Sequence, residues 1–191
     1  MVLAVCAALK KREKAPVIVW DADALNILAE RMNREGLMSL EERCGYLERL
    51  LPDGAILTPH PGEAARLFGS TIHELTGDLP GTAKRIGACC NLTVALKDAV
   101  TLVVSEKELF LNTTGNNGMS TGGSGDVLTG IIAALAAAGM RSFEAASVGV
   151  WIHGAAGDRA TEKLGAVSVI ARDLLFAIGE LFAEKGDEKV K

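Results

Sequence analysis

The sequence lacks a surplus of positive charge. Its 191 residues include 20 Lys and Arg against 24 Asp and Glu, which gives a formal net charge of −4. Nucleic acids and anionic membranes attract proteins through clustered positive charge, and this composition offers no such field. We therefore expect neither nucleic acid nor a membrane surface among the partners of this chain.

Long hydrophobic runs are also missing. The longest uncharged apolar stretch, from Val127 to Met140, contains two glycines and is shorter than the roughly 20 residues that cross a bilayer. At the start of the chain, the apolar residues 1–9 precede Lys10, Lys11 and Arg12, which is the reverse of the charge order in a secretory signal. These observations predict a cytoplasmic protein.

Cysteines are few, and none has the C-x-x-C spacing of a zinc or redox site. The four thiols, Cys6, Cys44, Cys89 and Cys90, are expected to be reduced and mostly buried. No linker rich in proline, glycine and serine divides the chain, and no internal repeat is visible. We predict a single domain over residues 1–191.

What the sequence does contain is an alternation of short apolar runs and amphipathic segments. Strands are expected at 17–20, 55–58, 92–96, 101–104 and 109–112, the last two forming a hairpin. Helices are expected at 2–9, 24–34, 39–51, from 63, at 80–90, from 125 to 138, at 142–163 and at 171–183. The alternation predicts an α/β sheet layered between helices.

The segment with the most chemical information is the glycine-rich run from residue 112 to residue 130. Gly122, Gly123 and Gly125 remove side chains where a helix is expected to begin, so successive backbone N–H groups can converge on an anion. The run is neither a Walker A loop nor a G-x-G-x-x-G turn. Asp126 adds a carboxylate that suits deprotonation of a hydroxyl attacking phosphorus. The alternative is a favourable charge in the first helical turn, with glycines that allow close packing.

Three motifs occur together in this chain. They are Asp21-Ala-Asp-Ala-Leu-Asn26, Thr58-Pro-His-Pro-Gly-Glu63 and Thr121-Gly-Gly-Ser-Gly-Asp-Val-Leu-Thr-Gly130. With them the chain resembles the ADP/ATP-dependent NAD(P)H-hydrate dehydratase family, the YjeF C-terminal type of the ribokinase-like superfamily. The resemblance implies a ribokinase-like three-layer α/β/α sandwich. It also implies repair of hydrated NADH or NADPH: ADP or ATP, with Mg²⁺, phosphorylates the ring hydroxyl, and phosphate is then eliminated.

The resemblance implies a role for each matching position of the glycine-rich run. Asp126 corresponds to the catalytic base, placed to contact the substrate and take the proton of its hydroxyl group. The anion hole that holds the transferred phosphoryl group corresponds to Gly122, Gly123, Ser124 and Gly125. Gly125 is also expected to contact the nucleotide.

The two shorter motifs carry further candidate residues. The resemblance implies that His60, where related kinases commonly have Asn, contacts the hydrated nicotinamide, and that Glu63 orients water around magnesium. Outside this motif, His60 would be a turn residue and Glu63 a favourable first-turn charge. Asp21 and Asp23 are paired carboxylates at a strand end, which suits a metal or water-positioning site, with a helix N-cap as the alternative for Asp23.

The segment 97–101 corresponds to the loop with which the family wraps its nucleotide. The expected nucleotide contacts are Lys97, Asp98, Ala99, Val100 and Thr101. Because the family usually has Lys-Gly-Ala-Gly-Thr here, Asp98 brings a carboxylate near the polyphosphate and Val100 restricts a permissive backbone. We expect these two residues to alter nucleotide affinity or identity.

Four residues elsewhere complete the prediction. Thr113 and Asn117 stand where the family often has proline, so we expect a looser loop before the anion hole. His153 and Asp158 lie on a helix whose small residues predict close packing against a neighbour. Both are expected to be structural, with the adenine side of the site as the alternative.

Two other functions stay open beside the dehydratase. One is a sugar or vitamin kinase of the same superfamily, and the other is a non-catalytic nucleotide-binding fragment. The family's domain has further strands and helices ahead of the position of Asp21, so we expect an N-terminally truncated form with an open sheet edge near its start. The family often forms tetramers, which implies a homo-oligomer.

Overall fold

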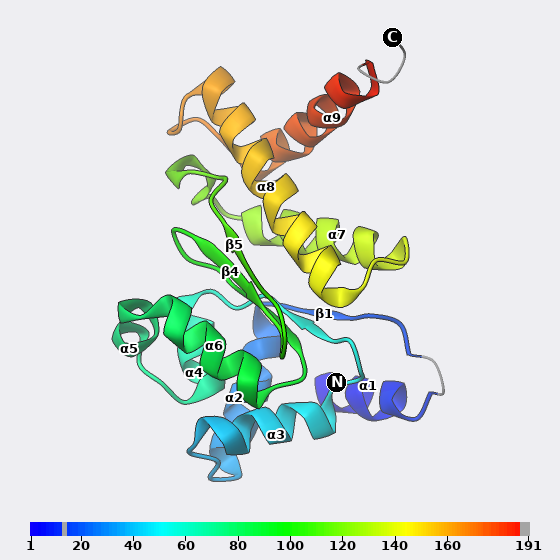
Figure 1. Ribbon diagram of the computed structural model, residues 1–191, viewed down its shortest axis with the longest axis vertical. Helices are drawn as coiled ribbons and strands as arrows, with labels where there is room; N and C mark the ends of the chain where they lie inside the picture. Colours follow the sequence, from blue (N-terminus) through cyan, green and yellow to red (C-terminus); the bar gives the residue numbers. More distant parts are fainter. Residues whose placement is uncertain (13–14, 188–191) are drawn as a thin grey trace.

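The computed structural model describes residues 1–12 and 15–187 and contains one sheet with helices on both faces (Figure 1). Its strands follow one another in space in the order of the chain. The first three are parallel, and the last two are antiparallel to their neighbours. They are β1 (Val19–Trp20), β2 (Ile56–Leu57), β3 (Thr93–Leu96), β4 (Thr101–Val104) and β5 (Leu109–Asn112).

One face of the sheet is covered by the helices of the first half of the chain (Figure 1). These are α1 (Val2–Lys10), α2 (Asp23–Arg34), α3 (Leu40–Leu50), α4 (Pro61–Phe68), α5 (Ile72–Gly77) and α6 (Leu79–Cys89). The opposite face is covered by α7 (Ser124–Ala137) and α8 (Ser142–Leu164), and α9 (Ala171–Asp187) packs on these two. The predicted α/β/α layering is confirmed.

The core divides between the two faces because side chains alternate along a strand. Leu57, Val94 and Leu96 point into the cluster that contains α2, α3, α4 and α6. Ile56 and Ala95 point into the cluster formed with α7 and α8. Continuous apolar strands such as β3, buried at all four positions, are therefore what two covered faces require.

The observed elements differ from the expected ones in a few places. The strands β1 and β2 keep only two of their four expected residues in the ladder, and β1 forms the expected sheet edge near the start of the chain. Helix α5 was not expected, because its short pattern is mostly polar; it begins with a Thr71–Glu74 capping box. A short 3₁₀ turn, η1 (Asn117–Met119), lies inside the glycine-rich loop.

The cysteine prediction is confirmed. All four thiols are free, and Cys6, Cys44 and Cys90 are buried while Cys89 is partly buried. Burial raises the pKa of the Cys6 thiol, which makes it a poor nucleophile at neutral pH.

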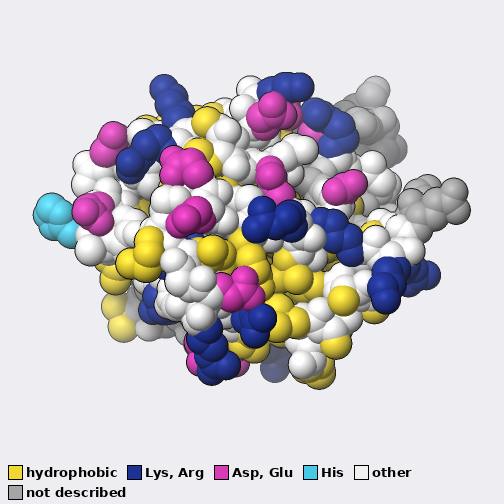
Figure 2. Space-filling model, turned by 90° about the horizontal axis from the view of Figure 1, so that it is seen from below, with side chains coloured by type: hydrophobic (Ala, Val, Ile, Leu, Met, Phe, Trp, Pro, Cys, Tyr) yellow, Lys and Arg dark blue, Asp and Glu magenta, His cyan; other side chains and the backbone are white. Residues whose placement is uncertain are grey.

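The surface mixes charges of both signs. On the face seen from below in Figure 2, basic and acidic side chains are interspersed around apolar ones, and no block of a single sign stands out. Within the described ranges, no helix combines the length and the apolarity that a bilayer crossing needs. The predicted homo-oligomer and the predicted single domain over residues 1–191 stay predictions.

Helix α3 begins at the capping box that the sequence predicts. The Ser39 hydroxyl accepts a hydrogen bond from the Glu42 N–H at 3.1 Å, and the Glu42 carboxylate accepts one from the Ser39 N–H at 2.9 Å. Ser39→Ala should lower the free energy of unfolding by about 1 kcal/mol, because one first-turn N–H loses its partner. Urea denaturation measures this change. Ser39→Asp, which keeps an acceptor oxygen, is the control, and an equal loss in both variants would contradict the assignment.

Candidate active site

An ion pair lies at the carboxyl end of the parallel strands. Asp21 follows β1 and Lys97 follows β3, and the Lys97 Nζ atom lies 3.0 Å from Asp21 Oδ1. Thr129 of α7 donates its hydroxyl to the other carboxylate oxygen at 2.9 Å. Burial raises the pKa of Asp21, but the Lys97 charge and hydrogen bonds from Lys97, Thr58 and Thr129 outweigh it and lower the pKa overall. Asp21 is therefore ionised at neutral pH, and each of its carboxylate oxygens has a hydrogen-bond partner.

Helix α7 begins directly above this ion pair. A Cβ atom on Gly125 would lie 3.6 Å from Lys97 Nζ and 3.7 Å from Asp21 Oδ2. The N-cap is Gly123, whose φ of +86° suits glycine and whose missing side chain leaves the first turn without a side-chain cap. The Ser124 N–H donates to the Thr121 carbonyl oxygen at 3.2 Å. The positive end of the helix dipole lies beside the Lys97 ammonium, itself paired with Asp21, and a helix start of this kind favours an anion.

Asp126, in the same helical turn, does not line the cavity described below. It is exposed, and its Oδ2 atom would be 4.0 Å from a Cβ placed on the exposed Gly123. Lys97, Ser124 and Gly125 instead line a cavity, which the described part of the chain builds without Asp126, Gly122 or Gly123. Of the first turn of α7, Ser124 and Gly125 therefore face the cavity, whereas the Asp126 carboxylate is exposed outside its lining.

The cavity has a volume of about 740 Å³, which is within the range of small-molecule and cofactor sites. Its walls come from the segment 97–101, the loop 112–121, the first turn of α7 and one face of α8, with His60 at the rim. Of the residues expected at the nucleotide, Lys97, Asp98, Ala99 and Thr101 line it, whereas Val100 points to solvent.

His60 and Glu63 hold each other at the start of α4. The His60 Nδ1 atom accepts a hydrogen bond from the Gly62 N–H at 3.0 Å, and its Nε2 atom lies 3.4 Å from Glu63 Oε1. Glu63 is buried and accepts the His60 N–H at 2.9 Å. His60 and Glu63 thus cap the start of α4. His60 is also exposed at the cavity rim, and its contact with a nicotinamide stays a prediction.

His153 of α8 is a partly buried titratable group of the cavity wall. Its Nε2 atom lies 2.9 Å from the Ser124 carbonyl oxygen and 3.2 Å from the Ser124 hydroxyl. Burial lowers the pKa of His153 to about 4, with a further contribution from the Lys97 charge, against the hydrogen bond to Ser124. A neutral ring with its proton on Nε2 donates to the carbonyl and leaves the Ser124 hydroxyl unactivated.

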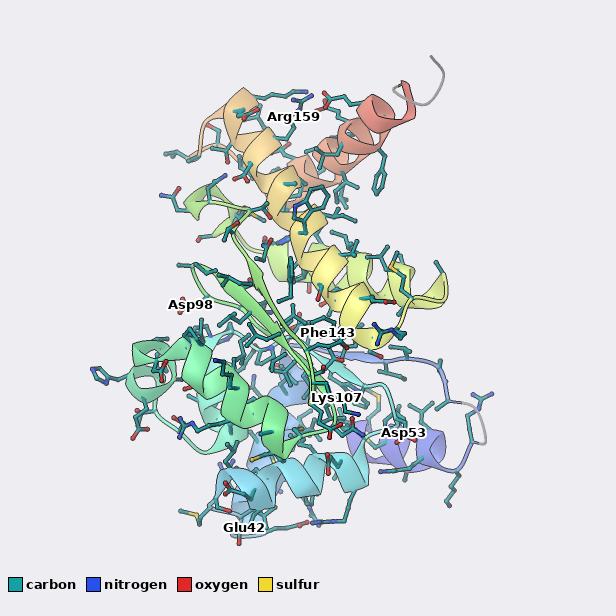
Figure 3. All side chains as sticks on the ribbon, in the orientation of Figure 1. Glu42, Asp53, Asp98, Lys107, Phe143 and Arg159 are labelled. Carbon is teal, nitrogen blue, oxygen red and sulfur yellow. The ribbon has the colours of Figure 1, made fainter. Side chains whose placement is uncertain are left out.

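Asp98 lies beyond the end of the sheet, on the side away from Lys107 and Asp53 (Figure 3). Its side chain accepts the N–H of Ala99 at 2.8 Å and lines the cavity. The carboxylate that replaces the glycine of the family is therefore exposed at the cavity mouth and turned onto its own loop.

The carboxylates near the cavity do not form a ready metal site. Within the described residues, no three His, Cys, Asp or Glu side chains are grouped as ligands. Asp21 is held by Lys97 and Thr129, and Glu63 by His60. Asp23 is the first residue of α2 and not its N-cap, which is Ala22. A magnesium role for Glu63 stays a prediction.

Several cavity residues lay outside the sequence-based set. Asn112, Thr114, Asn116 and Met119 line the wall, and Asp158 fastens this loop to α8. Their polarity was visible in the sequence, but nothing local showed which of them face inward. The proximity of Asp21 and Lys97 could have been predicted from the sequence, because each follows a parallel strand and the carboxyl ends of parallel strands share one edge of the sheet.

A family model and a related protein of known name place this chain in the same family. The family model for NAD(P)H-hydrate dehydratase matches residues 3–179. The ADP-dependent (S)-NAD(P)H-hydrate dehydratase of Neisseria meningitidis is 46% identical over 149 residues, which cover 78% of this chain and 47% of that protein. This chain thus spans about half the length of that relative.

Solved structures agree with this result. The ADP/ATP-dependent NAD(P)H-hydrate dehydratase of Bacillus subtilis, co-crystallised with ATP and Mg²⁺, is 30% identical with a TM-score of 0.65, over 68% of this chain and 47% of that one. A ribokinase-like superfamily protein of Enterococcus faecalis is 26% identical with a TM-score of 0.74, over 95% of this chain and 58% of that one. The fold is ribokinase-like, and the chain belongs to the NAD(P)H-hydrate dehydratase family.

Proposed function

We propose that this chain binds ADP or ATP in the cavity and uses it to dehydrate hydrated NADH or NADPH at the start of α7. The observation that carries the proposal is the convergence of Lys97, the uncapped first turn of α7 and the cavity at one place. Family membership supplies the reaction class. The site geometry supports the proposed places of the phosphoryl donor and acceptor.

The cavity and the exposed Asp126 suit the two partners of a phosphoryl transfer. Attacking and leaving oxygens lie roughly in line on opposite sides of the phosphorus. A nucleotide in the cavity would direct its terminal phosphate at the first turn of α7 from the side of Lys97. The hydroxyl of the hydrate would approach from outside the cavity, where Asp126 is exposed.

The proposed reaction has two steps, phosphorylation of the ring hydroxyl and elimination of phosphate. Asp126 takes the proton of the ring hydroxyl, whose oxygen bonds to the terminal phosphorus while the bond to the leaving nucleotide breaks. Phosphate then leaves with the electrons of the C–O bond, and loss of a ring proton restores the dihydronicotinamide. ADP would yield AMP and phosphate, and ATP would yield ADP and phosphate. The first-turn N–H groups and Lys97 can stabilise the phosphoryl charge in both steps.

Magnesium fits this proposal as part of the nucleotide. Mg²⁺ in nucleotide sites is usually held by phosphate oxygens, water and one or two carboxylates. Because Asp21 and Glu63 are already engaged, the ion would be carried on the phosphates with its own water molecules. No step above requires a metal ligand from this chain.

The direct test is recovery of reduced-nicotinamide absorbance when the protein is mixed with hydrated NADH or NADPH, Mg²⁺ and ADP or ATP. We expect the absorbance to return with release of phosphate, and Asp126→Asn to slow turnover by about 10²-fold or more because the base is lost. Glu41→Gln, which removes an exposed first-turn carboxylate of α3 away from the cavity, is the matched control. A stable phosphorylated product would indicate a kinase, and full activity of Asp126→Asn would overturn the role of Asp126.

Asp98 should weaken nucleotide binding. Its exposed carboxylate lines the cavity that would hold the polyphosphate, so it should repel the phosphates of the nucleotide. Asp98→Asn should therefore lower the dissociation constant of ADP by about threefold at low salt, and by less at high salt, where the repulsion is screened. Titration calorimetry at two salt concentrations measures this. Glu106→Gln, in the exposed turn between β4 and β5, is the control, and equal affinities for all three proteins would refute the effect.

His153 should make stability depend on pH. Its folded pKa of about 4 lies below the unfolded value of about 6.5, so the stability from the neutral ring is present above pH 6.5 and is lost as the pH falls toward 4. Between pH 7 and pH 4.5, wild type should lose on the order of 2 kcal/mol more than His153→Gln. Urea denaturation at both pH values measures the difference. Exposed His73→Gln should behave like wild type, and parallel pH profiles for all variants would contradict the assignment.

A further inference from the structure

The loop 112–121 lies along one face of α8 and is bonded to it at successive turns. The Asn112 side chain donates to the Val150 carbonyl oxygen at 3.2 Å, and the Thr114 hydroxyl donates to that of Trp151, also at 3.2 Å. The backbones approach closely here: a Cβ on Gly154 would lie 2.6 Å from the Thr114 carbonyl oxygen. The expected close packing of the small residues of α8 is therefore observed, with this loop as a neighbour.

Asp158 makes the central contacts. One carboxylate oxygen accepts the Gly115 N–H at 2.9 Å, and the other accepts the Asn116 side-chain amide at 2.7 Å. The Asn116 side-chain oxygen, Oδ1, then accepts the Gly118 N–H and the Thr161 hydroxyl, each at 2.9 Å. A single carboxylate thus fixes two adjacent residues of the loop, and through Asn116 it fixes η1.

This loop forms a cavity wall and leads into the helix start. Gly115, Asn116 and Met119 line the cavity, and the chain then enters α7 at Ser124, whose carbonyl oxygen is bonded to His153. Helix α8 therefore holds both the loop and the first turn of α7. Thr113 and Asn117, where the family often has proline, lie in the same loop, so side-chain bonds to α8 can supply the order that proline would otherwise supply.

We propose that Asp158 is a positioning residue of the nucleotide site, acting through the loop 112–121; this rests on the proposed function of the cavity. Fixing the backbone of a residue costs about 1–2 kcal/mol, so a loop left free in the apo protein would have to be ordered when the ligand binds. Asp158 removes that cost in advance, because Gly115 and Asn116 are held before any ligand arrives. Asp158 need not touch the nucleotide itself.

The first experiment requires no ligand. Hydrogen exchange of the apo protein should show amides of residues 113–121 exchanging at least tenfold faster in Asp158→Ala than in wild type, with the amides of β3 and β4 unchanged. Glu162→Gln, an exposed carboxylate one turn along the same helix, should leave the loop unchanged. Unchanged loop exchange in Asp158→Ala would overturn the proposal.

The second experiment measures ADP affinity by calorimetry, together with kcat and KM for ADP in the repair assay. Asp158→Ala should raise the dissociation constant and the KM about tenfold and keep kcat within about twofold at saturating ADP, a separation that general destabilisation would not produce. Thr161→Val, which loses only one outer bond, should have a smaller effect. Faster loop exchange with unchanged ADP affinity would refute the positioning role alone, whereas a wild-type protein that binds no ADP would refute the proposed function as well.

Discussion

The ion pair between Asp21 and Lys97 determines how the site is built. Both groups are largely buried, and removing charges from water is costly unless each finds a partner. Thr129 of α7 supplies a further hydrogen bond to Asp21, and Gly125 allows the first turn of the helix to lie directly against the pair. The strands β1 and β3 and the helix α7 are thereby connected at one point, which is where we propose that an anion binds.

The cavity and the candidate base are distinct parts of this region. Lys97 lines the cavity, and the exposed Asp126 does not. A base on the cavity side would compete with the nucleotide for the same space and repel its phosphates. In the proposed phosphoryl transfer the attacking and leaving oxygens would lie on opposite sides of the phosphorus, so a base outside the cavity fits that proposal.

Helix α8 has a structural role at the site: its side chains bond the first turn of α7 and the loop before it. His153 is kept neutral by burial and bonds the first turn of α7, and Asp158 bonds the loop before it. A charged imidazole beside Lys97 would add to the positive charge already buried there. On one face of α8, the neutral His153 ring thus bonds a backbone carbonyl oxygen of α7, and the Asp158 carboxylate bonds N–H groups of the loop 112–121.

Much of this could be read from the sequence. The capping box at Ser39, the hairpin of β4 and β5, the buried parallel strands and the glycine-rich helix start depend on local spacing, because backbone geometry and side-chain alternation act over a few residues. The bonds from Asp158 to Gly115 and Asn116 join segments far apart in the chain, and the exposure of Asp126 outside the cavity lining depends on the packing around α7. Only the tertiary structure decided these, because whether a polar group faces a partner, a cavity or water depends on how the sheet and its two helical layers pack.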